Sequence, residues 1–199
     1  MKIFCIGRNK TGTTSLEGEL QRLGYQVGHQ QAAERLLREY VDRDFEPIIE
    51  YCKTANAFQD FPFSYPETFK HLDRAYPDSK FILSIRNSPE EWYDSLLRYN
   101  TKVLKEVTAD AMKAFPYIWK GWLWEHHVAI YNVTETDTHN REELIRTYNE
   151  YNTSVIEYFK GRDNLLVLNL GERDSYQKFL TFLDIESPYT EFLHWNRTN

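Results

Sequence analysis

The amino-acid sequence predicts an α/β fold in which a mainly parallel sheet is flanked by helices. Short apolar runs, of which residues 80–86 form the strongest, alternate with longer segments whose apolar residues recur at helical spacing. Strands with fully apolar cores are typical of parallel sheets, which helices cover on both faces. Because the 199-residue chain has no linker rich in proline and glycine, we expect a single domain over residues 1–199.

The chain opens with the order strand, turn, helix. Residues 2–6 form an apolar strand, and residues 13–24 form a helix that closes at Gly24, the residue type that most often ends a helix. Further strands are expected at 25–28, 56–60, 80–86 and 164–171. Further helices are expected at 30–44, 45–52, 64–76, 90–107, 117–131, 140–162 and 174–184, with Ser64 as an N-cap and Pro89 at a helix start.

The composition excludes several classes of partner. A net charge of −6 argues against the broad basic surface that nucleic acid or a polyanionic polysaccharide requires. Cys5 and Cys52 are far apart and outside any C-x-x-C spacing, so neither a disulfide framework nor a zinc site is indicated. Since we find no signal peptide and no apolar run of about 18 residues, we expect a cytoplasmic protein with no membrane partner.

The turn from Gly7 to Ser15 follows the first strand, "KIFCI". In a parallel sheet, ligands bind at the carboxyl ends of the strands, and the amides of such a turn and of a helix N-terminus bind anions. The pattern is not that of a Walker A loop, because Thr13 stands where the lysine would follow the second glycine, and Lys10 precedes Gly12. The turn therefore predicts a phosphate site of a different kind.

The segment "NKTGTT", residues 9–14, resembles the P-K-S-G-T-T loop of the sulfotransferases that use 3′-phosphoadenosine-5′-phosphosulfate (PAPS). The resemblance implies a P-loop-like sulfotransferase fold and transfer of a sulfuryl group to a hydroxyl or amine of a small-molecule acceptor. No metal is expected, because the transferred group carries a single charge overall. We expect the donor to be bound by Arg8, Asn9, Lys10, Thr11, Gly12, Thr13, Thr14, Ser15, Arg86, Ser95 and Arg197.

Two further features are similar to that family. An arginine that ends a later strand and a serine beyond it form the 3′-phosphate site of the family; here Arg86 is followed nine residues later by Ser95, one residue more than usual, and Ser88 is the alternative. The family also places a basic histidine before an apolar residue and a proline. In the segment "QDFP" of this chain, Asp60 occupies that position.

The chemistry assigns a different task to each candidate. Lys10 would stabilise the negative charge that grows on the oxygen between the phosphate and the sulfuryl group of the donor. Arg86 would bind the 3′-phosphate through two parallel hydrogen bonds. Asp60 would act as general base, with a pKa raised by the phenylalanines around it. The alternatives are that Asp60 caps the helix near Ser64 or pairs with a cationic acceptor, and that His29 is the base.

Two other functions are compatible with the turn. A P-loop kinase of small substrates shares the fold but normally has a lysine beside the second glycine, which this chain lacks. A nucleotide-binding module without catalysis would keep the loop and lack turnover. The aromatic content of 16% suggests an acceptor with an apolar or ring portion, and nothing in the sequence indicates an oligomeric state.

Overall fold

The structure is a computed structural model that describes residues 1–193. Its contacts divide the chain into two compact units, one formed by residues 1–87 and the segment from residue 154 onward, the other by residues 88–153. None of the helices in the described part of the chain is both long and apolar enough to span a membrane.

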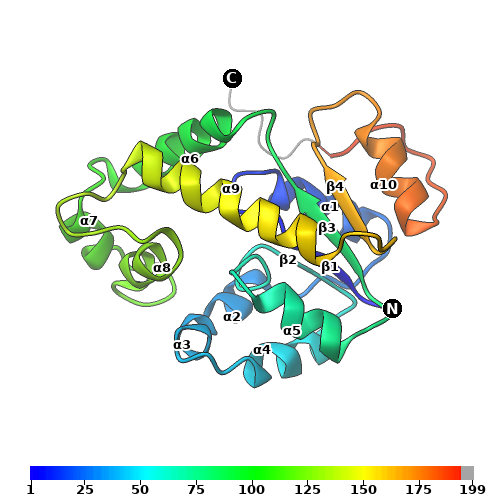
Figure 1. Cartoon of the computed structure of the whole chain (residues 1–199), viewed down its shortest axis with the longest axis horizontal. Helices are drawn as coiled ribbons and strands as arrows, with labels where there is room; N and C mark the ends of the chain where they lie inside the picture. The colour runs from blue at the N-terminus through cyan, green and yellow to red at the C-terminus, as the bar shows by residue number, and fades with distance from the viewer. Residues whose placement is uncertain (194–199) are drawn as a thin grey trace. The chain divides into compact units, whose positions relative to one another are not determined.

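The first unit contains one sheet of four parallel strands (Figure 1). The strands are β1 (Ile3–Cys5), β2 (Ala57–Gln59), β3 (Lys80–Ser84) and β4 (Leu165–Leu168). Their order is β2-β1-β3-β4, so that β1 lies between β2 and β3. In register, Ile3 pairs with Ala57 and Lys80, and Phe81 pairs with Leu165. The prediction of an α/β fold with a parallel sheet is confirmed.

Helices connect the strands, as the sequence predicts. The first unit contains α1 (Thr13–Arg22), α2 (Gln30–Glu34), α3 (Leu37–Val41), α4 (Glu46–Tyr51), the 3₁₀ helix η1 (Cys52–Thr54), α5 (Thr68–Ala75) and α10 (Ser175–Leu183). The second unit contains α6 (Pro89–Leu104), α7 (Ala109–Ala114) and α8 (Trp122–Tyr131). Helix α9 (Arg141–Tyr158) begins in the second unit and ends in the first.

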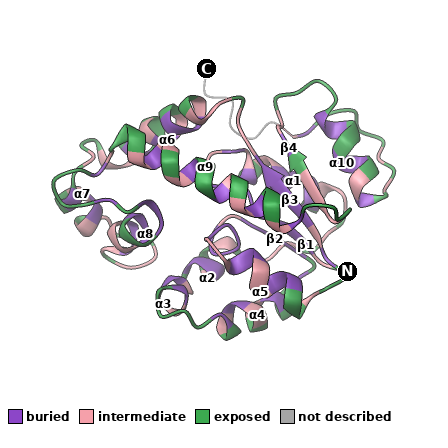
Figure 2. Cartoon of the chain, in the orientation of Figure 1, coloured by how far each residue is buried: buried purple, intermediate pink, exposed green. Residues whose placement is uncertain are grey.

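Strands β1, β2 and β3 are almost fully buried, with successive side chains on opposite faces of the sheet, whereas most residues of β4 are half-buried or exposed (Figure 2). Ile3 and Cys5 of β1 face a cluster formed with residues of α1 and α10. Phe4, between them, faces the other side and stacks on Phe58 and Phe81, with ring centroids 5.7 and 5.3 Å apart. This two-sided packing explains the continuous apolar character of the strands.

The second unit uses much of the aromatic content as core. Trp92 is fully buried and stacks on Tyr148 with ring centroids 4.5 Å apart. Buried His127 accepts a hydrogen bond from Asn100 at Nε2 (3.1 Å) and donates from Nδ1 to the carbonyl of Leu123 (2.8 Å). Burial lowers the pKa of His127 to about 4, so this ring is neutral at physiological pH.

Several expected boundaries are wrong. The helix expected from Ser64 begins at Thr68, because Pro66 disfavours helical backbone at the residue before it. The helix expected over 117–131 begins only at Trp122, after Gly121 adopts a φ of 91°. Residues 25–28 provide an isolated bridge from Val27 rather than a strand, and the helix expected over 30–44 is divided into α2 and α3.

Candidate active site

The loop between β1 and α1 is fixed to the end of β3. A Cβ atom on Gly7 would lie 2.0 Å from Oγ of Ser84, so only glycine lets the chain leave β1 at this point. The hydroxyl of Thr11 donates to the carbonyl of Arg8 (2.5 Å) and lies 2.6 Å from Oγ of Ser84. Since a hydroxyl has one proton to donate, Ser84 is the donor in the second bond.

Lys10, the expected catalytic cation, occupies the middle of this loop with a backbone φ of 67°. This left-handed conformation is uncommon for a residue with a side chain and costs free energy. Nε of Arg86 donates a 2.6 Å hydrogen bond to the Lys10 carbonyl and so holds the loop in this form. Both side chains are half-buried. The two cationic residues predicted from separate motifs are therefore in direct contact.

The first turn of α1 offers further donors to an anion. The helix begins after Gly12, whose φ is 102°, and this N-cap glycine has no side chain with which to cap the first-turn amides. Such amides are available to an anion and carry the positive end of the helix dipole. The hydroxyls of Thr14, which is exposed, and Ser15, which is half-buried, lie in the same turn. Together with Lys10, these groups form a set of donors that an anion can accept from.

Asp60 follows β2 at the same edge of the sheet and also has a left-handed backbone, with a φ of 58°. Its Oδ2 accepts a 2.8 Å hydrogen bond from the hydroxyl of Thr13. Its Oδ1 is inaccessible to solvent and has no hydrogen-bond partner among residues 1–193. Burial raises the pKa of Asp60 to about 6, although the bond from Thr13 and the charge of Lys10 oppose the rise. The structure thus brings the expected base within electrostatic reach of the expected cation.

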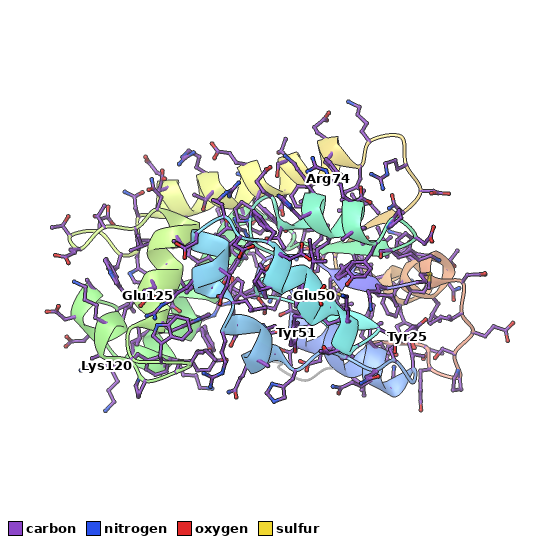
Figure 3. The ribbon with its side chains drawn as sticks, turned by 90° about the horizontal axis from the view of Figure 1, so that it is seen from below. Tyr25, Glu50, Tyr51, Arg74, Lys120 and Glu125 are labelled. Carbon is purple, nitrogen blue, oxygen red and sulfur yellow. The ribbon has the colours of Figure 1, made fainter. Side chains whose placement is uncertain are left out.

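The alternatives for the base can be placed as well. Asp60 does not cap α5, because that helix begins eight residues later. The carboxylate of Asp60 accepts a hydrogen bond from Thr13 instead. His29 uses Nδ1 to accept the amide of Ala32 at the start of α2 (3.3 Å), and its carbonyl accepts from the hydroxyl of Tyr51, which is labelled in Figure 3. His29 is therefore a helix cap in this structure.

A group of polar side chains beside Asp60 was not singled out by sequence reasoning. Nε2 of Gln59 donates to Oε1 of Gln30 (3.0 Å) and to Oε2 of Glu17 (3.4 Å). Burial raises the pKa of Glu17, and the neighbouring charge of His29 opposes this. The sequence did contain one signal for Glu17 in this group, because Thr13 and Glu17 are four residues apart and therefore share a face of α1.

Two residues of the expected donor set turn their side chains into the protein. Arg8 is 1% exposed, and its Nη1 donates to the carbonyl of Ser64 (3.2 Å), beyond β2. Thr11 is 2% exposed, and its amide also donates to the carbonyl of Arg8 (3.3 Å). These contacts give both residues a part in shaping the loop. Asn9 between them is half-buried.

The two serines considered for the 3′-phosphate belong to the second unit. Oγ of Ser88 accepts the amide of Glu91 (3.1 Å) and caps α6. Ser95 lies within α6 and is half-buried. Arg197, the last residue of the expected set, lies outside the described residues.

Other features of the described chain lie away from the loop. No group of three or more His, Cys, Asp or Glu side chains that could hold a metal ion occurs among residues 1–193. A cavity of ≈ 390 Å³ in the second unit is lined by residues between Tyr131 and Arg146, and a second cavity, of ≈ 360 Å³, lies between β4 and α10. Neither cavity includes a residue of the loop.

Comparison with known proteins gives one positive result. A search of the curated proteins found no significant match. The family model described as a sulfotransferase domain matches residues 2–199, almost the entire chain and both of its compact units. The match agrees with the resemblance carried by residues 9–14 and by Arg86, and with the four parallel strands of the sheet. The chain therefore belongs to the sulfotransferase domain family.

Proposed function

We propose that this protein is a PAPS-dependent sulfotransferase that acts on a hydroxyl or amine of a small-molecule acceptor. The observation that carries the proposal is the convergence of Lys10, Arg86 and Asp60 at one edge of the sheet. Arg86 donates a hydrogen bond to the Lys10 carbonyl, and the charge of Lys10 acts on the Asp60 carboxylate. The family supports sulfuryl transfer in general, and the choice of donor and acceptor is our inference. Because the family match spans both units, we propose one sulfotransferase domain over residues 1–199.

Lys10 would stabilise the leaving group. When bound, PAPS supplies a sulfuryl group whose bond to the phosphate oxygen breaks as the acceptor oxygen or nitrogen bonds to sulfur. Negative charge then grows on the oxygen that leaves with adenosine 3′,5′-bisphosphate. A cation placed at that oxygen stabilises the transition state more than the ground state, which is the condition for raising turnover.

Arg86 would serve binding. A guanidinium can hold a phosphate through two parallel hydrogen bonds, whereas an ammonium acts as a point charge. In this structure Nε of Arg86 is engaged with the Lys10 carbonyl at 2.6 Å. Arg86 would therefore combine two tasks, contact with the 3′-phosphate and support of the loop that carries Lys10.

Asp60 would receive the acceptor's proton. A carboxylate of ordinary pKa, near 3.8, is a weak base, but a pKa of about 6 brings it closer to physiological pH while leaving it mostly ionised there. The proton would move from the attacking group to the carboxylate as the new bond to sulfur forms. No metal is needed for this division of tasks among Lys10, Arg86 and Asp60.

The setting of the reaction is also part of the proposal. Cys5 and Cys52 are both buried and free, as is usual for proteins of a reducing compartment such as the cytoplasm. Burial raises the pKa of each thiol to about 12, so that neither is a reactive thiolate. We propose a cytoplasmic enzyme with a small-molecule acceptor.

Calorimetry and a transfer assay test this function together. Purified protein should bind adenosine 3′,5′-bisphosphate and should release it from PAPS when a panel of alcohols, phenols, amines and sugars is supplied without added metal. ATP is the matched control, because it offers phosphates without a 3′-phosphate. Micromolar binding of ATP with no binding of the bisphosphate would contradict the proposal and favour a kinase. Binding of the bisphosphate with no turnover on any acceptor would favour a non-catalytic module.

A further inference from the structure

Thr13 occupies an unexpected place in the site. The family resemblance places Thr13 among the residues expected to bind the donor, but the structure buries Thr13 to 4% exposure and directs its hydroxyl to Oδ2 of Asp60 at 2.8 Å. The two residues are 47 positions apart, and the bond joins the start of α1 to the end of β2. Thr13 thus links the loop between β1 and α1 to Asp60, the residue that we assign as base.

We infer that Thr13 is a positioning residue for Asp60, whose carboxylate it orients through the hydrogen bond to Oδ2. The inference rests on the proposed function. A hydroxyl has a single proton, and the proton that Thr13 donates to Asp60 is not available to a phosphate. The amide of Thr13 lies in the first turn of α1 and keeps its role as a donor to the anion. The hydroxyl of Thr13 therefore acts on the acceptor side, through Asp60, and its backbone amide acts on the sulfate donor.

The charge of the group beside the carboxylate gives the physical reason for a threonine here. A Walker A loop has lysine at this position, and an ammonium beside Asp60 would favour the ionised carboxylate strongly and weaken it as a base. A neutral hydroxyl orients the carboxylate with a smaller effect on its proton affinity. The other charged groups that act on Asp60 are Lys10 on the loop and Glu17 on α1, and their effects have opposite signs.

The test compares Thr13→Val with Thr13→Ser. Valine keeps the shape of the side chain and removes the hydroxyl, whereas serine keeps the hydroxyl. For Thr13→Val we expect the acid limb of kcat/KM to move up by about one pH unit, because a donor that favours the carboxylate is lost. Turnover above that limb should fall at least about 10-fold, and the Kd of adenosine 3′,5′-bisphosphate should change less than about threefold. Thr13→Ser should restore both the limb and the turnover.

Thr14→Val is the matched contrast, because Thr14 is the neighbouring hydroxyl in the same helical turn and is exposed. It should raise the Kd of the bisphosphate and leave the acid limb in place. The inference is overturned if Thr13→Val behaves in this way as well, or if it changes neither the limb nor the turnover. Should Thr13→Val fail to fold, Thr13→Ala carries the same test with the same criteria.

A second readout needs no turnover and separates the inference from the proposed function. The pKa of the Asp60 carboxyl can be followed by carbon-13 NMR, with the resonance assigned by its loss in Asp60→Asn. Thr13→Val should raise that pKa relative to the unsubstituted protein, and an unchanged value overturns the inference. If the unsubstituted protein neither binds the bisphosphate nor transfers sulfate, the proposed function fails while this measurement still decides whether Thr13 holds Asp60.

Discussion

Nε of Arg86 donates a 2.6 Å hydrogen bond to the carbonyl of Lys10, 76 residues earlier in the chain. The bond connects the end of β3 to the centre of the loop after β1, where Lys10 adopts a left-handed backbone. A residue that binds the donor would in this way also fix the position of the residue that stabilises the leaving group.

Arg86→Ala should raise the donor KM by about 10-fold or more, because a charge-assisted contact to the 3′-phosphate is lost in ground and transition states alike. We also expect a smaller fall in kcat for this variant, because the Lys10 carbonyl loses the hydrogen bond from Arg86. Arg86→Lys is the control that keeps the positive charge and loses the planar guanidinium with its two parallel donors. Steady-state kinetics in PAPS measure both effects. A fall in kcat with an unchanged KM would contradict the assignment of the 3′-phosphate to Arg86.

Lys10→Ala should lower turnover by roughly 10² to 10³-fold, the usual loss for a group that stabilises charge only in the transition state. Binding of adenosine 3′,5′-bisphosphate should weaken much less. Lys10→Arg, which keeps a cation on a longer and planar group, should recover part of the turnover. Calorimetry alongside single-turnover measurements separates the two quantities. Equal losses in binding and turnover would show that Lys10 holds the donor rather than the leaving group.

The rate should fall as the pH drops below about 6. Burial raises the pKa of Asp60 to that value, and a base must be ionised to accept a proton. The acid limb of kcat/KM should therefore have its midpoint near pH 6, and Asp60→Asn should abolish turnover at every pH. A limb that persists in a still active Asp60→Asn variant would identify another group, such as His29, as the base.

Asp60→Asn should also stabilise the folded protein. The folded pKa of Asp60, about 6, exceeds the ordinary value of 3.8, so its stabilising contribution is complete below pH 3.8 and is lost as the pH rises through 6. At pH 7 the asparagine variant should be more stable by roughly 1 to 3 kcal/mol. The difference should shrink towards pH 4. Thermal unfolding of both proteins across this range measures it, and a constant difference would refute the pKa shift.

Gly7→Ala should destabilise the fold by about 3 kcal/mol or more, because the added Cβ would lie 2.0 Å from Oγ and 2.4 Å from the backbone oxygen of Ser84. Since one of these atoms belongs to the backbone, a change of the Ser84 rotamer cannot relieve the clash. Gly171→Ala is the matched control, where the nearest atom is a side-chain oxygen at 3.3 Å. Its effect on urea unfolding should stay within about 0.5 kcal/mol. Equal effects of the two substitutions would contradict the close approach at Gly7.

Local patterns were sufficient to predict the fold class and the positions of the site residues along the chain. The alternation of apolar strands and amphipathic helices depends on residues close together in sequence, and it predicted the parallel sheet. Parallel strands end at one edge, so residues 7–15, Asp60 and Arg86 were expected there from sequence alone. Helix starts were predicted less well, because Pro66 and Gly121 delay α5 and α8 through backbone effects that the apolar spacing does not contain.

The sequence by itself determined the fold class, and it proposed the turn after the first strand as an anion site with Lys10, Arg86 and Asp60 as candidate residues. Only the tertiary structure decided which side chains meet. The bonds from Thr13 to Asp60 and from Arg8 to Ser64 join residues 47 and 56 positions apart. The loops that carry these residues contain left-handed backbone at Lys10 and Asp60, neither of which is a glycine. Side-chain partners were therefore set by how the loops fold over the sheet edge.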